Sequence, residues 1–253
     1  MDRNKVQPII ELYTCIQTEG SKAGIPHFLI RLTGCTHRCC FGEGGWCDSW
    51  YASIHPEKGS FTLNDVIKLF DENWQIAHVL ITGGSPTLYP ELVNDIVKLS
   101  HNRNFFVTIE TEGSHAIKTD TPIDLISLSP KFNNSIPKLG ALMPHGGVVT
   151  DAVIDQHNKY RCNAAVIEEL LSYHTDYHFK PVVDRNYPEI WEEIDEFIEQ
   201  LCIPSNKIWV MPAGDDRENL MANYSYVIEE CVKRGFNFSG RDHIIAYGKK
   251  RGV

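Results

Sequence analysis

Four of the chain's eight cysteines lie within residues 35–47, in a loop that reads G-C-T-H-R-C-C-F-G-E-G-G-W-C-D-S-W-Y over residues 34–51. Thiolate sulfur is a soft ligand, so this loop is suited to hold zinc or an iron–sulfur cluster. Cys35, Cys47 and one of the adjacent pair Cys39 and Cys40 would supply three ligands. A structural zinc site needs four protein ligands. A catalytic cluster held by three cysteines instead leaves one iron free for a substrate or cofactor.

Disulfides and zinc are the alternatives for this loop. The chain begins M-D-R-N-K-V-Q, without the apolar segment of a secretion signal, which argues against an exported disulfide protein. A zinc site would use Cys35, Cys39 or Cys40, Cys47 and His37. The usual zinc pattern pairs two C-x-x-C knuckles, and this sequence contains no C-x-x-C. The spacing of the cysteines alone does not exclude a zinc site.

Composition narrows the class of protein. The chain has 253 residues, of which 42% are hydrophobic and 23% charged, and this suits one domain over residues 1–253 that contains the cysteine loop. A net charge of -9 argues against binding to nucleic-acid phosphates, so we expect no nucleic-acid partner. The basic cluster Lys249, Lys250 and Arg251 is expected to be a solvated tail. No apolar run approaches the roughly 20 residues that span a bilayer, so we expect a cytoplasmic protein with no membrane partner.

Short β-like runs alternate with longer amphipathic ones, which is typical of a parallel sheet with crossover helices. The pattern predicts strands at 26–32, 78–82, 105–109, 125–128, 177–183 and 207–211. It predicts helices at 63–74, 90–99, 164–174, 189–201 and 219–234. The helix at 189–201 has the clearest 3.6-residue apolar period. We therefore expect an α/β fold, an incompletely closed βα barrel of about six parallel strands, with chemistry at the carboxyl ends of the strands.

Polar or glycine-rich segments follow each predicted strand. They are the cysteine loop, T-G-G-S-P, E-T-E-G, S-P-K, K-P-V-V-D and W-V-M-P-A-G, in chain order. Glycine at a strand end lets a ligand approach the backbone, and the polar groups would converge on one mouth of the barrel. Each segment alone is compatible with a plain turn. Together they predict one site.

These segments carry a resemblance to a known family. The loop C-T-H-R-C-(x7)-C-D-S-W-Y-A, followed by I-T-G-G-S-P, resembles radical S-adenosylmethionine enzymes, and in detail the 7-carboxy-7-deazaguanine synthase family of the queuosine pathway. E-L-Y-T-C-I-Q-T-E-G resembles that family's Q-G-E-G segment, and F-L-I-R-L-T-G-C its strand into the first cluster cysteine. I-E-T-E-G, S-L-S-P-K-F, V-M-P-A-G and R-D-H-I-I-A-Y-G follow in the family's order. The resemblance covers most of residues 9–248.

The resemblance implies that Cys35, Cys39 and Cys47 ligate a 4Fe-4S cluster whose fourth iron binds the amino and carboxylate groups of S-adenosylmethionine. Reduction would then cleave that cofactor to a 5′-deoxyadenosyl radical. No further catalytic residue is assigned. The residues implied to hold the methionine and adenosine parts follow the second, third, fourth and sixth predicted strands: Gly84, Glu110, Ser129, Pro130, Lys131, Met211, Pro212 and Ala213.

The substrate that the resemblance implies is 6-carboxy-5,6,7,8-tetrahydropterin, an anionic bicyclic molecule. The family, a lyase, contracts its ring and expels ammonia. Ile16, Gln17, Thr18 and Glu19 match the segment that reads the pterin, with Thr82 as a hydroxyl contact. Arg31 would bind the substrate carboxylate in a bidentate manner, through two N–H groups of its guanidinium. The resemblance also implies Mg²⁺ with Ser49 as its hydroxyl ligand, a flavodoxin-like or ferredoxin-like electron donor, and a homodimer.

Three features depart from the family pattern. The residues F-G-E-G-G widen the gap before Cys47, and Cys40 stands beside Cys39, so either can be the second ligand; the C-x3-C spacing favours Cys39. Ser85 replaces the glutamate of G-G-E-P, and Thr18 replaces a glycine of Q-G-E-G. Two other functions remain alternatives: an activase that plants a radical on a partner protein, and a zinc-stabilised binding module. The cysteines outside the loop are expected to pack as small apolar residues: Cys15, Cys162, Cys202 and Cys231.

Overall fold

The computed structural model of the chain describes residues 2–41, 45–144 and 146–253. Its main sheet has six strands in the order β10-β9-β8-β7-β3-β2, and all neighbours are parallel except β2, which runs antiparallel to β3. These strands are β2 (Ile9–Ile16), β3 (Pro26–Leu32), β7 (His78–Gly83), β8 (Phe106–Thr111), β9 (Leu125–Leu128) and β10 (Tyr177–Phe179). The predicted strands 26–32, 78–82, 105–109 and 125–128 are confirmed, with small shifts at their ends.

A second, parallel sheet extends the first toward a barrel. It has the order β11-β12-β13, with β11 (Val182–Val183), β12 (Trp209–Pro212) and β13 (Asn237–Phe238). One bridge, Phe179 to Ile208, links the two sheets. The predicted strand 177–183 is therefore wrong as a single strand. Lys180 N donates a hydrogen bond to Leu128 O of β9, whereas Pro181 O accepts one from Met211 N of β12. The chain therefore changes its partner strand between Lys180 and Pro181.

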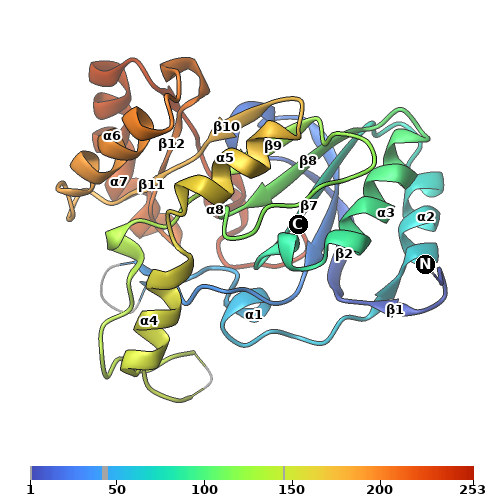
Figure 1. Cartoon of the computed structure of the whole chain (residues 1–253), viewed down its shortest axis with the longest axis horizontal. Helices are drawn as coiled ribbons and strands as arrows, with labels where there is room; N and C mark the ends of the chain where they lie inside the picture. Colours follow the sequence, from blue (N-terminus) through green and yellow to red (C-terminus); the bar gives the residue numbers. More distant parts are fainter. Residues whose placement is uncertain (1, 42–44, 145) are drawn as a thin grey trace.

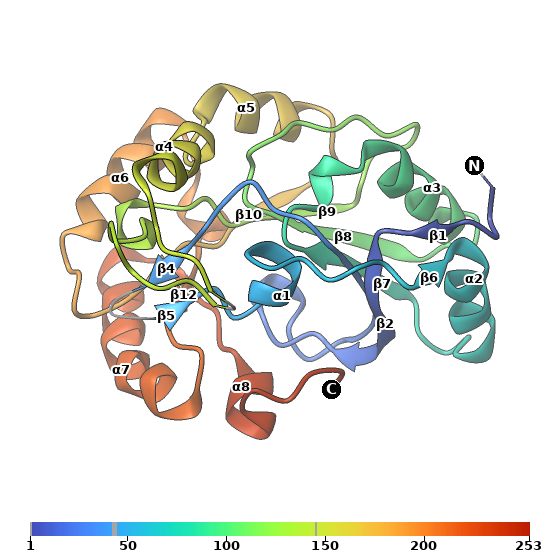
Figure 2. The same ribbon diagram turned by 90° about the horizontal axis from the view of Figure 1, so that it is seen from below.

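Helices cover the outside of the curved sheets, as Figure 1 and Figure 2 show. The helices are α1 (Trp50–Ser53), α2 (Leu63–Glu72), α3 (Pro90–His101), α4 (Asp151–Tyr160), α5 (Ala164–Ser172), α6 (Ile190–Gln200), α7 (Arg217–Arg234) and α8 (Asp242–Tyr247). Shorter 3-10 turns are η1 (Gly20–Lys22), η2 (Pro86–Leu88), η3 (Asn133–Ser135) and η4 (Ser205–Lys207). The remaining strand pairs are β1 (Val6–Gln7) with β6 (Phe61–Thr62), and β4 (Cys40–Phe41) with β5 (Gly45–Trp46). The five predicted helices are confirmed, and the fold is the expected incompletely closed α/β arrangement.

One buried apolar cluster runs from β2 to α7 and joins both sheets to their helices. Phe28, Phe70 and Phe105 meet at one end of it, and Phe132, Phe179 and Phe197 at the other. The helices present one apolar face to this core; in α6, for example, Ile190, Trp191, Ile194 and Phe197 are buried. No helix within the described ranges has the length and apolarity needed to cross a membrane.

Two parts of the chain differ from expectation. No strand is predicted at the antiparallel β2, where only the first three residues are buried, the next four are half-buried and Ile16 is exposed. The basic end of the chain is not a solvated tail. Arg251 pairs with Glu11 and Glu57 and lies 3.4 Å from the centroid of the Tyr51 ring, and Lys249 pairs with Asp215.

The cysteine loop is held against the end of β7 by backbone contacts. Ser85 N donates to Gly34 O (2.8 Å), and Gly34 N donates to Ala52 O (2.7 Å). A Cβ at Gly84 would lie 2.3 Å from Gly34 O, 2.7 Å from Ala52 O and 2.8 Å from the Cβ of Cys35. Such distances are far below van der Waals contact, so only glycine at position 84 permits this approach.

We expect Gly84→Ala to lower the free energy of unfolding by about 1–3 kcal/mol, because the added methyl would overpack backbone that cannot move away. Urea denaturation of the purified protein measures this. Gly24→Asn is the control: Gly24 has open space around it and φ +85°, which asparagine tolerates, so its effect should stay within about 0.5 kcal/mol. An unchanged urea midpoint for Gly84→Ala would contradict the packing argument.

Candidate active site

Three sulfur atoms line one cavity at the carboxyl ends of the strands. Cys35, Cys39 and Cys47 all contribute to this central cavity, and Cys47 N donates to Cys39 O over 3.1 Å. All three are free thiols, and burial raises the pKa of each. Three convergent soft donors without a disulfide fit the cluster that the motif implies.

The structure separates the adjacent cysteines Cys39 and Cys40. Cys40 begins β4 and pairs with Trp46 of β5, and successive side chains along an extended backbone point to opposite sides. Cys39 lines the central cavity, whereas Cys40 lines a separate hollow with Asn133 and Asn134. Cys39 therefore faces the other two thiols. Residues 42–44 of the widened segment lie outside the described residues.

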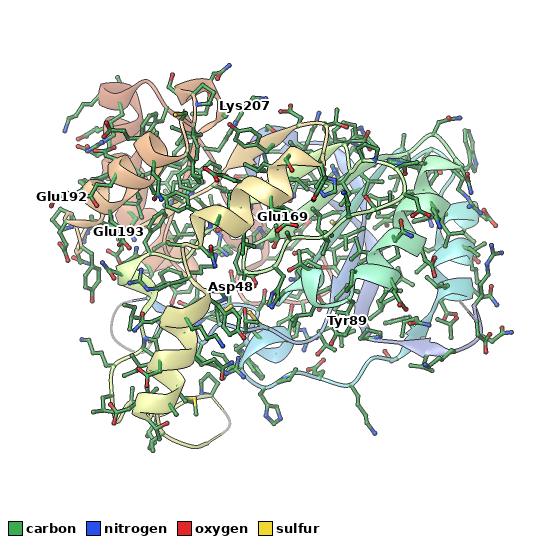
Figure 3. The ribbon with its side chains drawn as sticks, in the orientation of Figure 1. Asp48, Tyr89, Glu169, Glu192, Glu193 and Lys207 are labelled. Atoms are coloured by element: carbon green, nitrogen blue, oxygen red, sulfur yellow. The ribbon has the colours of Figure 1, made fainter. Side chains whose placement is uncertain are left out.

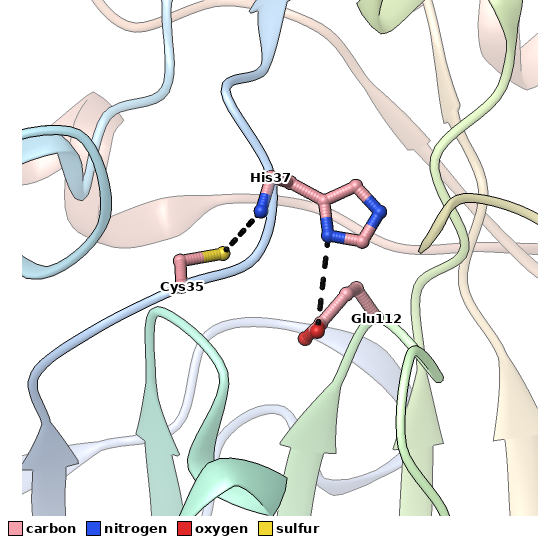
Figure 4. A group of neighbouring side chains, drawn as sticks. All are labelled: Cys35, His37 and Glu112. Atoms are coloured by element: carbon pink, nitrogen blue, oxygen red, sulfur yellow. Dashed lines mark hydrogen bonds and ion pairs between the residues drawn. The ribbon is translucent and has the colours of Figure 1, made fainter. Parts of the chain in front are cut away.

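Two buried polar side chains, His37 and Glu112, lie beside Cys35. Glu112, directly after β8, lies beside His37, with 3.8 Å between Glu112 Oε1 and His37 Nδ1. His37 N donates to Cys35 Sγ over 3.3 Å, and Figure 4 shows both side chains next to that sulfur. Ligand atoms of Cys35, His37 and Glu112 lie within 4.8 Å of one another. Burial, with smaller contributions from nearby cations, lowers the pKa of His37 to about 3, so its imidazole is neutral at pH 7.

A charged network forms another wall of the cavity. Lys180 Nζ donates to Glu19 Oε2 (2.5 Å) and to Glu110 Oε1 (2.9 Å), and Arg241 Nε donates to Glu19 Oε1 (3.1 Å). Thr82 Oγ1 donates to Glu110 Oε2 (2.9 Å). Burial alone would raise the pKa of Glu19 and of Glu110, but Lys180 and, for Glu19, Arg241 outweigh it and hold both carboxyls below their usual range. The same carboxylates raise the pKa of Lys180 against the effect of its burial.

The segment of Gln17 and Thr18 joins this network. Gln17 Nε2 donates to Glu110 Oε1 (3.4 Å), and its Oε1 accepts from Thr18 N (2.9 Å). The Thr18 hydroxyl lies 2.6 Å from His243 Nδ1 in α8. Thr18, which departs from the family's glycine, therefore fixes α8 against the cavity.

Arg31 and Ser49 lie together at the edge of the cavity. Arg31 Nε donates to Glu11 Oε2 (2.6 Å) and its Nη1 to Ser49 Oγ (3.3 Å). Ser49 Oγ donates to Asp48 Oδ1 (3.2 Å), and the other Asp48 oxygen pairs with Arg241. Although Ser49 precedes α1, its side chain does not cap that helix. In Figure 3, Asp48 lies toward the middle of the molecule, whereas Glu192 and Glu193 lie at its edge.

Nearly all the residues expected to form the site contribute to the central cavity. Those that line it are Ile16, Gln17, Thr18, Glu19, Arg31, Cys35, Cys39, Cys47, Ser49, Thr82, Gly84, Glu110, Ser129, Lys131 and Met211. Ala213 lines an adjoining cavity that shares Cys39, Lys131 and Met211 with the first. Pro130 and Pro212 line neither of these two cavities, although both are buried beside residues that do.

Sequence reasoning missed several residues of the cavity. Lys180, Arg241, His243 and Glu112 line it, and none was assigned a role. A lysine inside the apolar run 177–183 was the available signal for Lys180, and R-D-H-I-I-A-Y-G already contained Arg241 and His243. Cys15, expected to be a packing residue, also lines the cavity.

Comparison with known proteins identifies the family. A scan against protein-family models finds no match. The chain is 30% identical over 240 residues to a 7-carboxy-7-deazaguanine synthase of Halobacterium salinarum, covering 94% of this chain and 89% of the relative. It is 31% identical over 245 residues to one of Rhodopirellula baltica, covering 97% and 88%.

A solved structure agrees at the level of the fold. The crystal structure of QueE from Escherichia coli superposes with a TM-score of 0.59 at 22% sequence identity, covering 93% of this chain and 94% of that chain. Because the sequence relatives match over nearly their whole length, the chain belongs to the 7-carboxy-7-deazaguanine synthase family of radical S-adenosylmethionine enzymes, as its motifs predict.

Proposed function

We propose that this protein converts 6-carboxy-5,6,7,8-tetrahydropterin to 7-carboxy-7-deazaguanine with loss of ammonia, as a radical S-adenosylmethionine lyase. The observation that carries this proposal is the cavity itself. It joins three free thiols to a wall of paired carboxylates, cations and a carboxamide. Such a wall matches an anionic bicyclic substrate with many donors and acceptors.

Cys35, Cys39 and Cys47 would hold the 4Fe-4S cluster, because their sulfur atoms face one cavity and the donor set is soft. When bound, the cluster and S-adenosylmethionine supply the one-electron reduction and radical chemistry that start the reaction. Gly84 lines the cavity at the end of β7 and would present its backbone to the cofactor, while its missing side chain admits the cysteine loop. Ser129 accepts a hydrogen bond from Lys131 (2.9 Å), which orients that ammonium at the cavity wall.

The remaining cofactor contacts lie at two strand ends. Glu110, beside the cavity, offers a carboxylate to the ribose hydroxyls. Met211 and Ala213 offer an apolar side and a backbone surface to the adenine. Pro130 and Pro212 are buried and directly follow Ser129 and Met211 in the chain, so they would fix the backbone that carries those two residues.

Gln17, Thr18 and Glu19 would bind the pterin ring, with Ile16 and Thr82 beside them. Lys180 and Arg241 keep Glu19 ionised and oriented, so its carboxylate can accept from the ring amino and N–H groups. Glu11 holds Arg31 by its Nε. The edge formed by Nη1 and Nη2 is then the one that would meet the substrate carboxylate.

Ser49 is the proposed ligand of Mg²⁺. Asp48 Oδ1 lies 3.2 Å from the Ser49 hydroxyl, so the pair offers two hard oxygen atoms, and substrate and water oxygens would complete the shell. A homodimer, an external electron donor and a cytoplasmic location also remain predictions.

The decisive test is a product assay. Anaerobic reconstitution with iron and sulfide, followed by incubation with reductant, S-adenosylmethionine and 6-carboxy-5,6,7,8-tetrahydropterin, should yield 7-carboxy-7-deazaguanine detectable by mass spectrometry. Cofactor cleavage without this product would indicate another radical enzyme. A colourless protein that binds zinc would overturn the proposal.

Cys39→Ala should abolish the iron-dependent visible absorbance, because its sulfur faces the other two thiols, whereas Cys40→Ala should retain it. Iron content and the visible spectrum after reconstitution measure both variants. The two substitutions remove the same group from adjacent buried positions, so each controls for the other. Loss of the absorbance only in Cys40→Ala would reverse the assignment.

Lys180→Met should change how stability depends on pH. In the native chain the pKa of Glu110 is held below its usual value, so Lys180 stabilises the fold above about pH 4.5, and this stabilisation is lost as pH falls. Without Lys180 burial would raise the pKa of Glu110, and stability should instead fall as pH rises from 4 to 7. At pH 7 we expect a loss of about 3–5 kcal/mol.

Urea unfolding at several pH values measures this effect. Lys207→Met is the matched control, since Lys207 pairs with Asp176 at the surface and its loss should cost less than about 1 kcal/mol. A Lys180→Met protein whose stability still rises from pH 4 to pH 7 with the wild-type slope would contradict the role given to this lysine.

A further inference from the structure

Ser85 and Glu112 lie in contact although they follow different strands. Ser85 stands where the G-G-E-P motif has its glutamate, and its Oγ donates to Glu112 Oε1 over 2.5 Å. The two strands that precede them, β7 and β8, are adjacent and parallel, so their carboxyl ends meet at the same edge of the sheet. A carboxylate therefore lies directly beside position 85, supplied by position 112.

Glu112 is a buried acid that has no lysine or arginine partner in the described part of the chain. Its side chain is 4% exposed. Its Oε1 accepts from the hydroxyls of Ser85, Ser114 and Thr36, and its Oε2 has no hydrogen-bond partner among the residues that the structure describes. No described lysine or arginine forms an ion pair with Glu112.

A buried carboxyl group with one oxygen that lacks a hydrogen-bond partner is unfavourable unless a ligand supplies a donor. The neighbouring acids of the cavity each have a cation: Glu19 and Glu110 bind Lys180, and Asp48 binds Arg241. The exception at Glu112 therefore points to a donor that arrives with a bound molecule.

The position of Glu112 indicates which donor this is. Its carboxylate lies within 4.8 Å of Cys35 Sγ and lines the central cavity. We propose that Glu112 accepts a hydrogen bond from the amino group of the methionine part of S-adenosylmethionine. This inference rests on the proposed function.

The test is cofactor affinity without turnover. The reconstituted, unreduced protein is dialysed to equilibrium against S-adenosylmethionine, so that no cleavage occurs. Glu112→Gln keeps the shape and removes the charge, and it should raise the Kd about tenfold to hundredfold, since charge-assisted hydrogen bonds are the strong ones. Glu72→Gln in α2, where the carboxylate is 59% exposed, is the matched control and should leave the Kd unchanged.

An analogue with a 2-oxo group in place of the amino group removes the donor instead. Because the amino group would also ligate the cluster iron, both proteins should prefer S-adenosylmethionine, but the preference should be about tenfold or more larger in wild type than in Glu112→Gln. A second variant keeps the inference testable if Glu112→Gln does not fold. The exchange variant Ser85→Glu with Glu112→Ser should recover most of the affinity lost in Glu112→Ser, because it returns one carboxylate and one hydroxyl to the shared space.

The outcomes separate the inference from the function on which it rests. Cluster-loaded wild type that binds no S-adenosylmethionine would overturn the proposed function. Binding that is equally tight in wild type and Glu112→Gln would overturn only the inference. Loss of zinc from cluster-free Glu112→Gln, with cofactor affinity unchanged, would also overturn it and would assign Cys35, His37 and Glu112 to a metal site.

Discussion

The parallel pairing of β3 with β7 determines where the sulfur ligands lie. Leu32 is in register with Gly83 at the end of this pair, and Gly84 N donates to Leu32 O over 3.2 Å. The cysteine loop leaves β3 at this point, and backbone hydrogen bonds fix it to the segment after β7. The position of Cys35 is thus set by sheet register and by the absence of a side chain at Gly84, before any inorganic group is bound.

The cavity beyond that loop is organised by charge. Buried ions cost several kcal/mol each unless they are paired, and here Lys180 and Arg241 connect acids from distant parts of the chain. Glu19, Glu110 and Asp48 come from three separate segments, so these pairs also tie the segments together. Such a network provides oriented donors and acceptors without rearrangement when a ligand binds.

Sequence patterns predicted the parts of the fold that local chemistry determines. The strands 26–32 and 125–128 match β3 and β9 because each is an apolar run with clear boundaries. The strand 177–183 was wrong because a change of partner between Lys180 and Pro181 depends on two other strands. Helix α4 gave no signal, since His157 is its one buried residue.

For the site, too, the sequence predicted what is local and missed what depends on distant parts of the chain. Motifs identified most of the residues of the cavity, but not how they pair. Lys180 and Glu19 are 161 residues apart, and no local pattern connects them. The choice between Cys39 and Cys40 favoured by spacing is supported by the alternation of side chains at β4, which needs the hairpin geometry to be known.

The contact between Ser85 and Glu112 has an evolutionary consequence. A family motif records residues at fixed positions, whereas the proposed contact with the cofactor requires one acid at one point in space, and neighbouring strand ends can each provide it. A descendant that moves the acid from one strand end to the other must pass through an ancestor with either two acids or none. The two positions should therefore change together in a lineage, and a motif search that inspects only one of them would misjudge such a chain as defective.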